Sequence, residues 1–75
     1  MAKAHIFISG QVQGVGFRYF LRGKLAELGV IGWVKNLADG RVEAEFSGEA
    51  GKIREILKWC KEGPPLAKVK RIEQV

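Results

Sequence analysis

Apolar and polar residues alternate along the N-terminal part of the chain, from Lys3 to Ser9. Ala4, Ile6 and Ile8 fall on one side of this segment, and the residues between them fall on the other. A period of two residues is typical of a strand with one buried face, and β-branched residues favour the same structure. We therefore predict a central strand of a sheet here.

The same alternation returns in two segments that are separated by a short turn. Val30 to Asn36 is predicted as a strand, and Val42, Ala44 and Phe46 alternate with polar residues in the next segment. An Asp-Gly pair at positions 39–40 lies between them, and such a pair is typical of tight hairpin turns. The two segments are therefore predicted to form a β-hairpin.

Two other segments repeat their apolar residues at helical spacing. Phe17 to Leu28 is predicted as an amphipathic helix, and Gly29 after it is typical of a helix end. Glu49 to Lys61 is predicted as a second helix, with an acidic residue at its positive end and Gly63-Pro64-Pro65 beyond its end. One face of this second helix carries Ile53, Ile56, Leu57 and Cys60.

The last segment, Ala67 to Val75, gives a weaker strand pattern. Ala67 and Val69 fall on one face, whereas Ile72 falls on the other. A single residue that breaks the alternation is typical of a β-bulge. We expect a bulge near Lys70-Arg71, or a less regular edge of the sheet.

The predicted elements follow the order β-α-β-β-α-β. This is the split βαβ, ferredoxin-like arrangement, an α+β fold in which two helices cover one face of a four-stranded antiparallel sheet. With 75 residues and no linker or repeat, we expect a single domain over residues 1–75 with a thin margin of stability. Because this fold supports many activities, the function has to be argued from a site.

Composition narrows the classes of partner. The net charge of +5 and a pI near 9.7 favour anionic partners, either small phosphates or nucleic acid. No apolar run approaches the length that a membrane span needs, and the N-terminus lacks the apolar core of a signal peptide. A single cysteine leaves no partner for a disulfide or a C-x-x-C site, which favours a cytoplasmic protein.

The clearest candidate for chemistry is the segment Gly10-Gln-Val-Gln-Gly-Val-Gly-Phe-Arg18, which precedes the first predicted helix. Its glycines allow successive backbone N–H groups to converge on one point, and the helix macrodipole adds positive potential there. Arg18, in the first turn, adds a planar set of donors that fits phosphate. The pattern is neither G-x-G-x-x-G nor a P-loop. It predicts a backbone cradle for an oxyanion.

This segment, together with Gly32-Trp33-Val34-Lys35-Asn36, Asp39-Gly40-Arg41-Val42-Glu43 and Gly48, closely resembles the signature of the acylphosphatase family. The resemblance covers nearly the whole chain. It implies an enzyme that hydrolyses small acyl phosphates to a carboxylate and inorganic phosphate, with the phosphate also acting as an inhibitor. We expect neither a metal nor another cofactor, because an acyl phosphate is reactive enough to be hydrolysed without one and the sequence has no cluster of metal ligands at a suitable spacing.

The resemblance also implies roles for individual residues. Arg18 would bind the phosphate and Asn36 would position the attacking water. The backbone of the cradle would supply the other phosphate contacts, from Gln13, Gly14, Val15, Gly16 and Phe17. An acyl phosphate already has a good leaving group, so positioning and charge neutralisation are enough for this reaction. We hypothesise that the bound phosphate itself takes the proton, because no protein base lies near the two motifs.

Two other functions stay open. An RNA-binding domain of the same topology would need aromatic residues on its central strands, whereas Arg41 to Phe46 supplies two acidic residues and one aromatic ring. Nucleic acid is therefore not an expected partner. The chain could also be an inactive or truncated acylphosphatase-like binding module, similar to the N-terminal part of hydrogenase-maturation carbamoyltransferases. Met1 shortly before the first strand, with no linker, favours a free-standing protein.

The remaining polar candidates are interpreted as structural. His5 is expected to be a structural or surface residue, and Cys60 a small buried apolar residue rather than a nucleophile. Glu43 and Glu45 share one strand face, which we expect to be solvated rather than to form a metal site. A basic cluster on the last strand is typical of a sheet edge that resists pairing.

The C-terminus raises a separate expectation. Members of the acylphosphatase family usually continue into a short fifth strand, and this chain stops at Val75. We therefore expect an exposed sheet edge, with self-association through that edge or a lower stability as its consequence.

Overall fold

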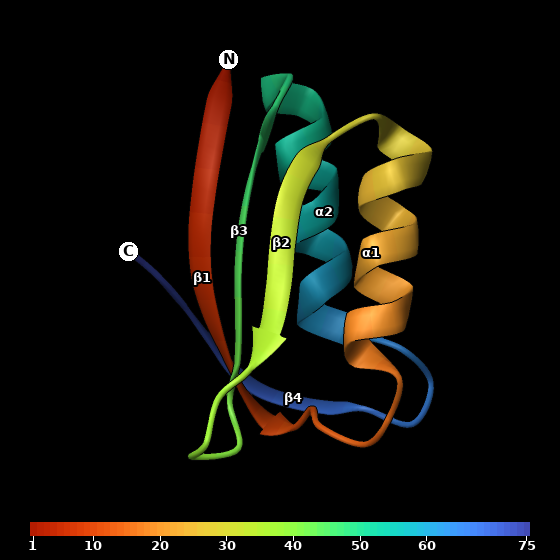
Figure 1. Cartoon of the computed structure of the whole chain (residues 1–75), viewed down its shortest axis with the longest axis vertical. Helices are drawn as coiled ribbons and strands as arrows, with labels where there is room; N and C mark the ends of the chain where they lie inside the picture. The colour runs from red at the N-terminus through yellow and green to blue at the C-terminus, as the bar shows by residue number, and fades with distance from the viewer.

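Six elements follow one another in the predicted order in a computed structural model that describes residues 1–75 (Figure 1). They are β1 (Ala2–Gln11), α1 (Phe17–Leu28), β2 (Ile31–Asn36), β3 (Val42–Gly48), α2 (Ala50–Glu62) and β4 (Lys68–Gln74). The bounds of α1 are those predicted. The largest difference is in β1, which extends to Gln11 because its last residues pair with β4.

The four strands form one sheet in the order β2-β3-β1-β4, and every neighbouring pair is antiparallel. This order places β1 and β3 in the interior and leaves β2 and β4 at the edges. Both helices cover the same face of the sheet (Figure 1). The ferredoxin-like prediction is therefore confirmed.

The core lies between the sheet and the two helices. The alternating apolar residues of β1 and β3 are buried, and they pack against the inner faces of α1 and α2. Removal of this apolar surface from water is the main force that holds the layers together. The predicted helix faces contribute Phe17, Leu21, Leu25, Ile53, Ile56 and Cys60, whereas Leu57 is only half-buried.

The bulge predicted in the last strand is present. Ser9 is opposite Arg71, but the next residue, Gly10, is opposite Val69, which leaves Lys70 without a partner in β1. Gly10 has a φ of +126°, and a Cβ atom there would lie 2.1 Å from a carbonyl oxygen of β4. The first glycine of the glycine-rich segment therefore serves the pairing of β1 with β4.

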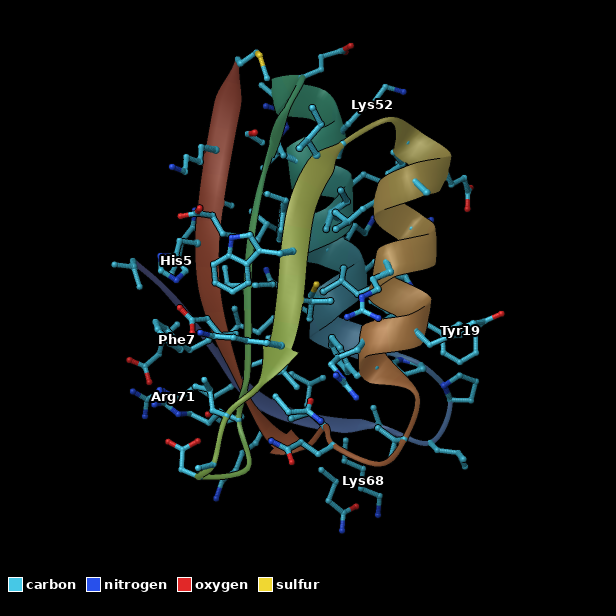
Figure 2. All side chains as sticks on the ribbon, viewed as in Figure 1. His5, Phe7, Tyr19, Lys52, Lys68 and Arg71 are labelled. Carbon is cyan, nitrogen blue, oxygen red and sulfur yellow. The ribbon has the colours of Figure 1, made fainter.

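The sheet face away from the helices corrects one expectation. The side chains of Glu43 and Glu45 are only 14% and 29% exposed. Glu43 contacts His5 at 2.6 Å and Lys35 at 3.6 Å. Glu45 contacts Lys3 at 3.6 Å. They are not freely solvated because β3 is an interior strand with a neighbour on each side. Figure 2 shows the labelled His5 and Phe7 on this open face. This face is separate from the layer that contains α1.

Candidate active site

The segment between β1 and α1 has an unusual backbone. Gly14 and Gly16 have φ values of +74° and +81°, and Val15 between them does not have a positive φ. Val12 and Phe17 are buried at the two ends of the segment, and Val15 packs against the core. Alternation of left-handed and ordinary conformations turns successive N–H groups toward one side of the chain, as in anion-binding nests.

These N–H groups have no acceptor within the protein. The carbonyl of Gly16 accepts the first hydrogen bond of α1, from the N–H of Phe20 at 2.9 Å. The N–H groups from Gly14 to Tyr19 donate no backbone or side-chain hydrogen bond. The first turn of α1 contains no acidic residue that would neutralise its positive end. The segment is therefore rich in free donors at a positive potential.

A small cavity of about 160 Å³ lies over this segment. Its walls come from the loop, the first turn of α1 and the end of β2, and comprise Val12, Gly14, Gly16, Phe17, Arg18, Tyr19 and Asn36. This volume is well below the roughly 300–1,000 Å³ of pockets that enclose a drug-sized ligand. The cavity therefore suits one small group of a ligand rather than a whole organic molecule.

The fold explains why Asn36 and Arg18 line the same cavity. Val34 is buried beneath the helices, and Asn36, two residues further along β2, faces the same side of the sheet. β2 ends at the end of the molecule where α1 begins (Figure 1). The two residues that the sequence singled out for chemistry therefore line one cavity.

Most of the predicted site residues line this cavity, namely Gly14, Gly16, Phe17, Arg18 and Asn36. Gln13 and Val15 do not line it. Val12 and Tyr19 line it and were missed. The only sequence feature that could have indicated Val12 is that it is an apolar residue in a mostly polar loop. The only one for Tyr19 is that it directly follows Arg18. Figure 2 shows Tyr19 beside the start of α1, pointing away from the sheet.

The side chain of Gln13 points elsewhere. Its Nε2 donates to the carbonyl oxygens of Leu37 at 2.7 Å and Arg41 at 3.0 Å. These two residues flank the turn between β2 and β3. The loop that precedes α1 is thus joined to the turn that follows Asn36.

That turn is itself well ordered. The N–H of Leu37 donates to the carbonyl of Arg41 at 2.8 Å, and the Asp39 carboxylate accepts from the backbone N–H and the Nε of Arg41. The backbone hydrogen bond from Arg41, followed by the side-chain one, lowers the pKa of Asp39 below its usual value of 3.8. These contacts hold the end of β2, and with it Asn36, in place.

The guanidinium of Arg18 forms no ion pair with any carboxylate of the chain. Arg18 is exposed, so its planar set of donors is available to an anion. No group of three or more His, Cys, Asp or Glu side chains is placed to hold a metal ion. Arg18 and the start of α1 both place positive charge at this site.

A wider and shallower hollow of about 800 Å³ runs along the outer side of α1. It shares Arg18 and Tyr19 with the small cavity and is also lined by Arg22, Lys24 and the rings of Phe20 and Trp59, among others. Gly14, Gly16 and Phe17, whose N–H groups are free donors, line the small cavity and not this hollow. The wider hollow gives an open surface next to it. No helix is both long enough and apolar enough to cross a membrane.

Known proteins match nearly the whole chain. The acylphosphatase family model matches residues 4–75. A curated acylphosphatase of Rubrobacter xylanophilus is 54% identical over 95% of this chain and 64% of its own length, and one of Roseiflexus is 52% identical over 97% and 78%. The crystal structure of acylphosphatase from Bacillus subtilis superposes with a TM-score of 0.96 at 39% identity, covering 100% of this chain and 83% of that one.

Family and fold thus agree over nearly the whole chain. The structural relative shares the same arrangement of elements, and the family match includes both the cradle segment and the end of β2. The chain belongs to the acylphosphatase family, hydrolases that act on the carboxyl–phosphate bond.

Proposed function

We propose that this chain hydrolyses acyl phosphates in the small cavity between the β1–α1 loop and the end of β2. Arg18 binds the phosphoryl group and Asn36 positions the attacking water. The observation that supports this most directly is that Arg18, Asn36 and the two left-handed glycines, Gly14 and Gly16, line the same cavity. Membership of the acylphosphatase family supports the reaction class.

Phosphate binding combines backbone and side-chain donors. The N–H groups of the cradle, from Gln13 to Phe17, contact the non-bridging phosphoryl oxygens, and the guanidinium of Arg18 neutralises their charge. These donors are fixed by the fold before substrate arrives, so little reorganisation is needed during the reaction. The charge that develops on the phosphoryl oxygens is therefore stabilised without a metal.

Asn36 serves the nucleophile. Its amide offers both a carbonyl acceptor and N–H donors, so it orients a water molecule toward phosphorus on the side opposite the leaving group. The oxygen of this water bonds to phosphorus while the bond from phosphorus to the carboxyl oxygen breaks. The acyl group leaves as a carboxylate with the bond electrons, and a proton of the water passes to a phosphoryl oxygen. A carboxylate is a weak base, so no general acid is required.

The acyl group of the substrate lies outside the cradle. A cavity of about 160 Å³ holds the phosphoryl group, and the wider hollow that shares Arg18 and Tyr19 receives the rest of the molecule. The cradle selects the phosphoryl group of the substrate. The hollow is open to solvent, so it places few limits on the acyl group.

A direct assay tests the function. The purified chain, dialysed against EDTA, is incubated with benzoyl phosphate while loss of the acyl phosphate is followed against the uncatalysed rate. We expect turnover that survives EDTA and is inhibited competitively by inorganic phosphate. RNA binding is measured in parallel. Absence of turnover in a folded sample would contradict the proposal and favour a binding module, and restoration by Mg²⁺ or Zn²⁺ would contradict the metal-free mechanism.

A further inference from the structure

Gln13 lies next to the cradle, but its side chain contacts the turn that follows Asn36. We propose that Gln13 is a positioning residue that fixes Asn36, and hence the attacking water, relative to the bound phosphoryl group. The inference rests on the proposed function and extends it to a side chain that touches neither substrate nor water.

The hydrogen bonds of Gln13 join two parts of the site that are distant in sequence. Nε2 donates to the carbonyl of Leu37 at 2.7 Å and to that of Arg41 at 3.0 Å. Both amide hydrogens of the side chain are therefore used. Leu37 directly follows Asn36, and Arg41 stands at the other end of the turn, so one amide holds both ends of the β2–β3 connection.

No other hydrogen bond replaces this link. Asn36 lies at the end of an edge strand, whose only neighbour in the sheet is β3. No other backbone or side-chain hydrogen bond joins residues 12–16 to the β2–β3 turn. The distance between the phosphate donors and Asn36 is thus set by packing and by the two hydrogen bonds of Gln13.

Catalysis is sensitive to this distance. The water and the leaving group must lie on opposite sides of phosphorus, and a displacement of about 1 Å can cost about 10² in rate. Loss of the Gln13 donors leaves the turn's own hydrogen bonds intact but removes its link to the cradle, so the turn and Asn36 can shift together relative to the bound phosphoryl group. The cradle N–H groups and Arg18 keep their own supports in β1 and α1. Removal of the side-chain amide should therefore slow the chemical step more than it weakens phosphate binding.

The residue type fits this role. Gln13 is half-buried, and its amide meets two acceptors with two donors. Asparagine is one methylene shorter and cannot reach both carbonyls from the same backbone position. Methionine has a similar length but no N–H group, so Gln13→Met removes the donors while filling nearly the same volume.

The first experiment separates turnover from phosphate binding. For Gln13→Met we expect kcat for benzoyl phosphate to fall about tenfold or more, while the dissociation constant of inorganic phosphate, measured by calorimetry, changes less than about threefold. Gln11→Met is the matched control, because Gln11 is exposed and forms no side-chain hydrogen bond. It should leave both quantities unchanged. If Gln13→Met does not fold, Gln13→Asn replaces it with the same expectations.

The second experiment is a double-mutant cycle with Asn36→Ala. If Gln13 acts through Asn36, then Gln13→Met changes kcat by less than about twofold once Asn36 is alanine, because there is no amide left to position. The same kcat loss in both backgrounds would overturn the inference, and so would equal losses of kcat and phosphate affinity. An inactive wild type would instead contradict the proposed function. Wild-type kcat in Gln13→Met would contradict this inference alone.

Discussion

At the scale of single residues, Asn36 is available for catalysis because the fold makes no other use of its side chain. It is exposed at the end of β2, and its amide takes part in no hydrogen bond with the protein. We predict that Asn36→Ala lowers kcat for benzoyl phosphate by about 10². Phosphate still binds, because Arg18 and the cradle N–H groups remain.

Steady-state kinetics and calorimetric binding of inorganic phosphate check this prediction. Gln74→Ala is a suitable control, since Gln74 is an exposed amide on β4. An equal loss of kcat and of phosphate affinity in Asn36→Ala would make Asn36 a phosphate ligand or a structural residue of the turn.

Cys60 illustrates a residue that the fold keeps unreactive. It is buried on the inner face of α2, and desolvation raises the pKa of its thiol from 9.0 to about 12. We predict no reaction with a disulfide reagent at pH 8 in the native protein and full reaction in guanidinium chloride, as monitored by absorbance. Rapid modification of the native protein would contradict the burial.

The same pKa sets a dependence of stability on pH. The folded-state pKa is above the unfolded one, so the native state holds the proton more tightly. This contribution to stability is fully present below pH 9 and is lost as the pH rises toward about 12. Denaturant titrations of the wild type and of Cys60→Ala, compared between pH 8 and pH 11, should show a smaller decline in the variant.

Residues that carry a local signal could be predicted from the sequence. Arg18 lies two residues after Gly16, and Asn36 belongs to the second segment that resembles the acylphosphatase signature, so both could be named from the sequence. Tyr19 and the contacts of the Gln13 side chain could not be predicted. They depend on where the start of α1 and the β2–β3 turn lie in space, which the tertiary packing decides.

At the scale of elements, Gly10 determines how β1 pairs with β4. Its φ of +126° and the 2.1 Å approach of a Cβ to a carbonyl oxygen exclude any side chain without backbone movement. We predict that Gly10→Ala destabilises the protein by about 3 kcal/mol or more, since strain and a backbone clash add. Denaturant unfolding followed by circular dichroism measures this.

Gly23 provides the matched control within α1. A Cβ there meets no atom within 4 Å, and its backbone is helical. Gly23→Ala should therefore stabilise the protein by about 0.5–1 kcal/mol, because alanine favours the helix. Equal effects of the two substitutions would contradict the structural role of the bulge.

The bulge also shows how far pattern analysis extends to elements. The broken alternation of Val69 and Ile72 was enough to predict an irregularity near Lys70. The role of Gly10 could not be predicted in the same way, because it depends on the register of two strands that lie far apart in sequence. In the same way, the half-burial of Glu43 followed from the interior position of β3, which the strand pattern alone does not reveal.

At the scale of the whole molecule, the sheet has two edges without a neighbour, β2 and β4. The β2 edge is partly apolar, with Ile31 74% and Trp33 40% exposed. Unpaired edges invite pairing with another chain. We predict self-association that depends on concentration, or else a thermal midpoint below that of a version extended by a designed C-terminal strand.

Sedimentation velocity over a wide range of concentrations and thermal unfolding of both versions check this prediction. Asn36 is the last residue of β2, so fraying of this edge strand should also lower kcat. Activity is therefore measured in the same samples. A strict monomer with no gain from the added strand would mean that the four-stranded sheet is self-sufficient.

The central claim, that this chain hydrolyses acyl phosphates with Arg18 as its phosphate-binding side chain, is tested most directly by Arg18 variants. Hydrolysis of benzoyl phosphate is measured with inorganic phosphate titrated as inhibitor, and Arg54→Ala on the exposed side of α2 is the control. We predict that Arg18→Ala lowers turnover by about 10³ or more and also weakens inhibition by phosphate. Arg18→Lys should recover little of either, because lysine lacks the planar donor pair. Near-normal turnover in either variant would contradict the claim.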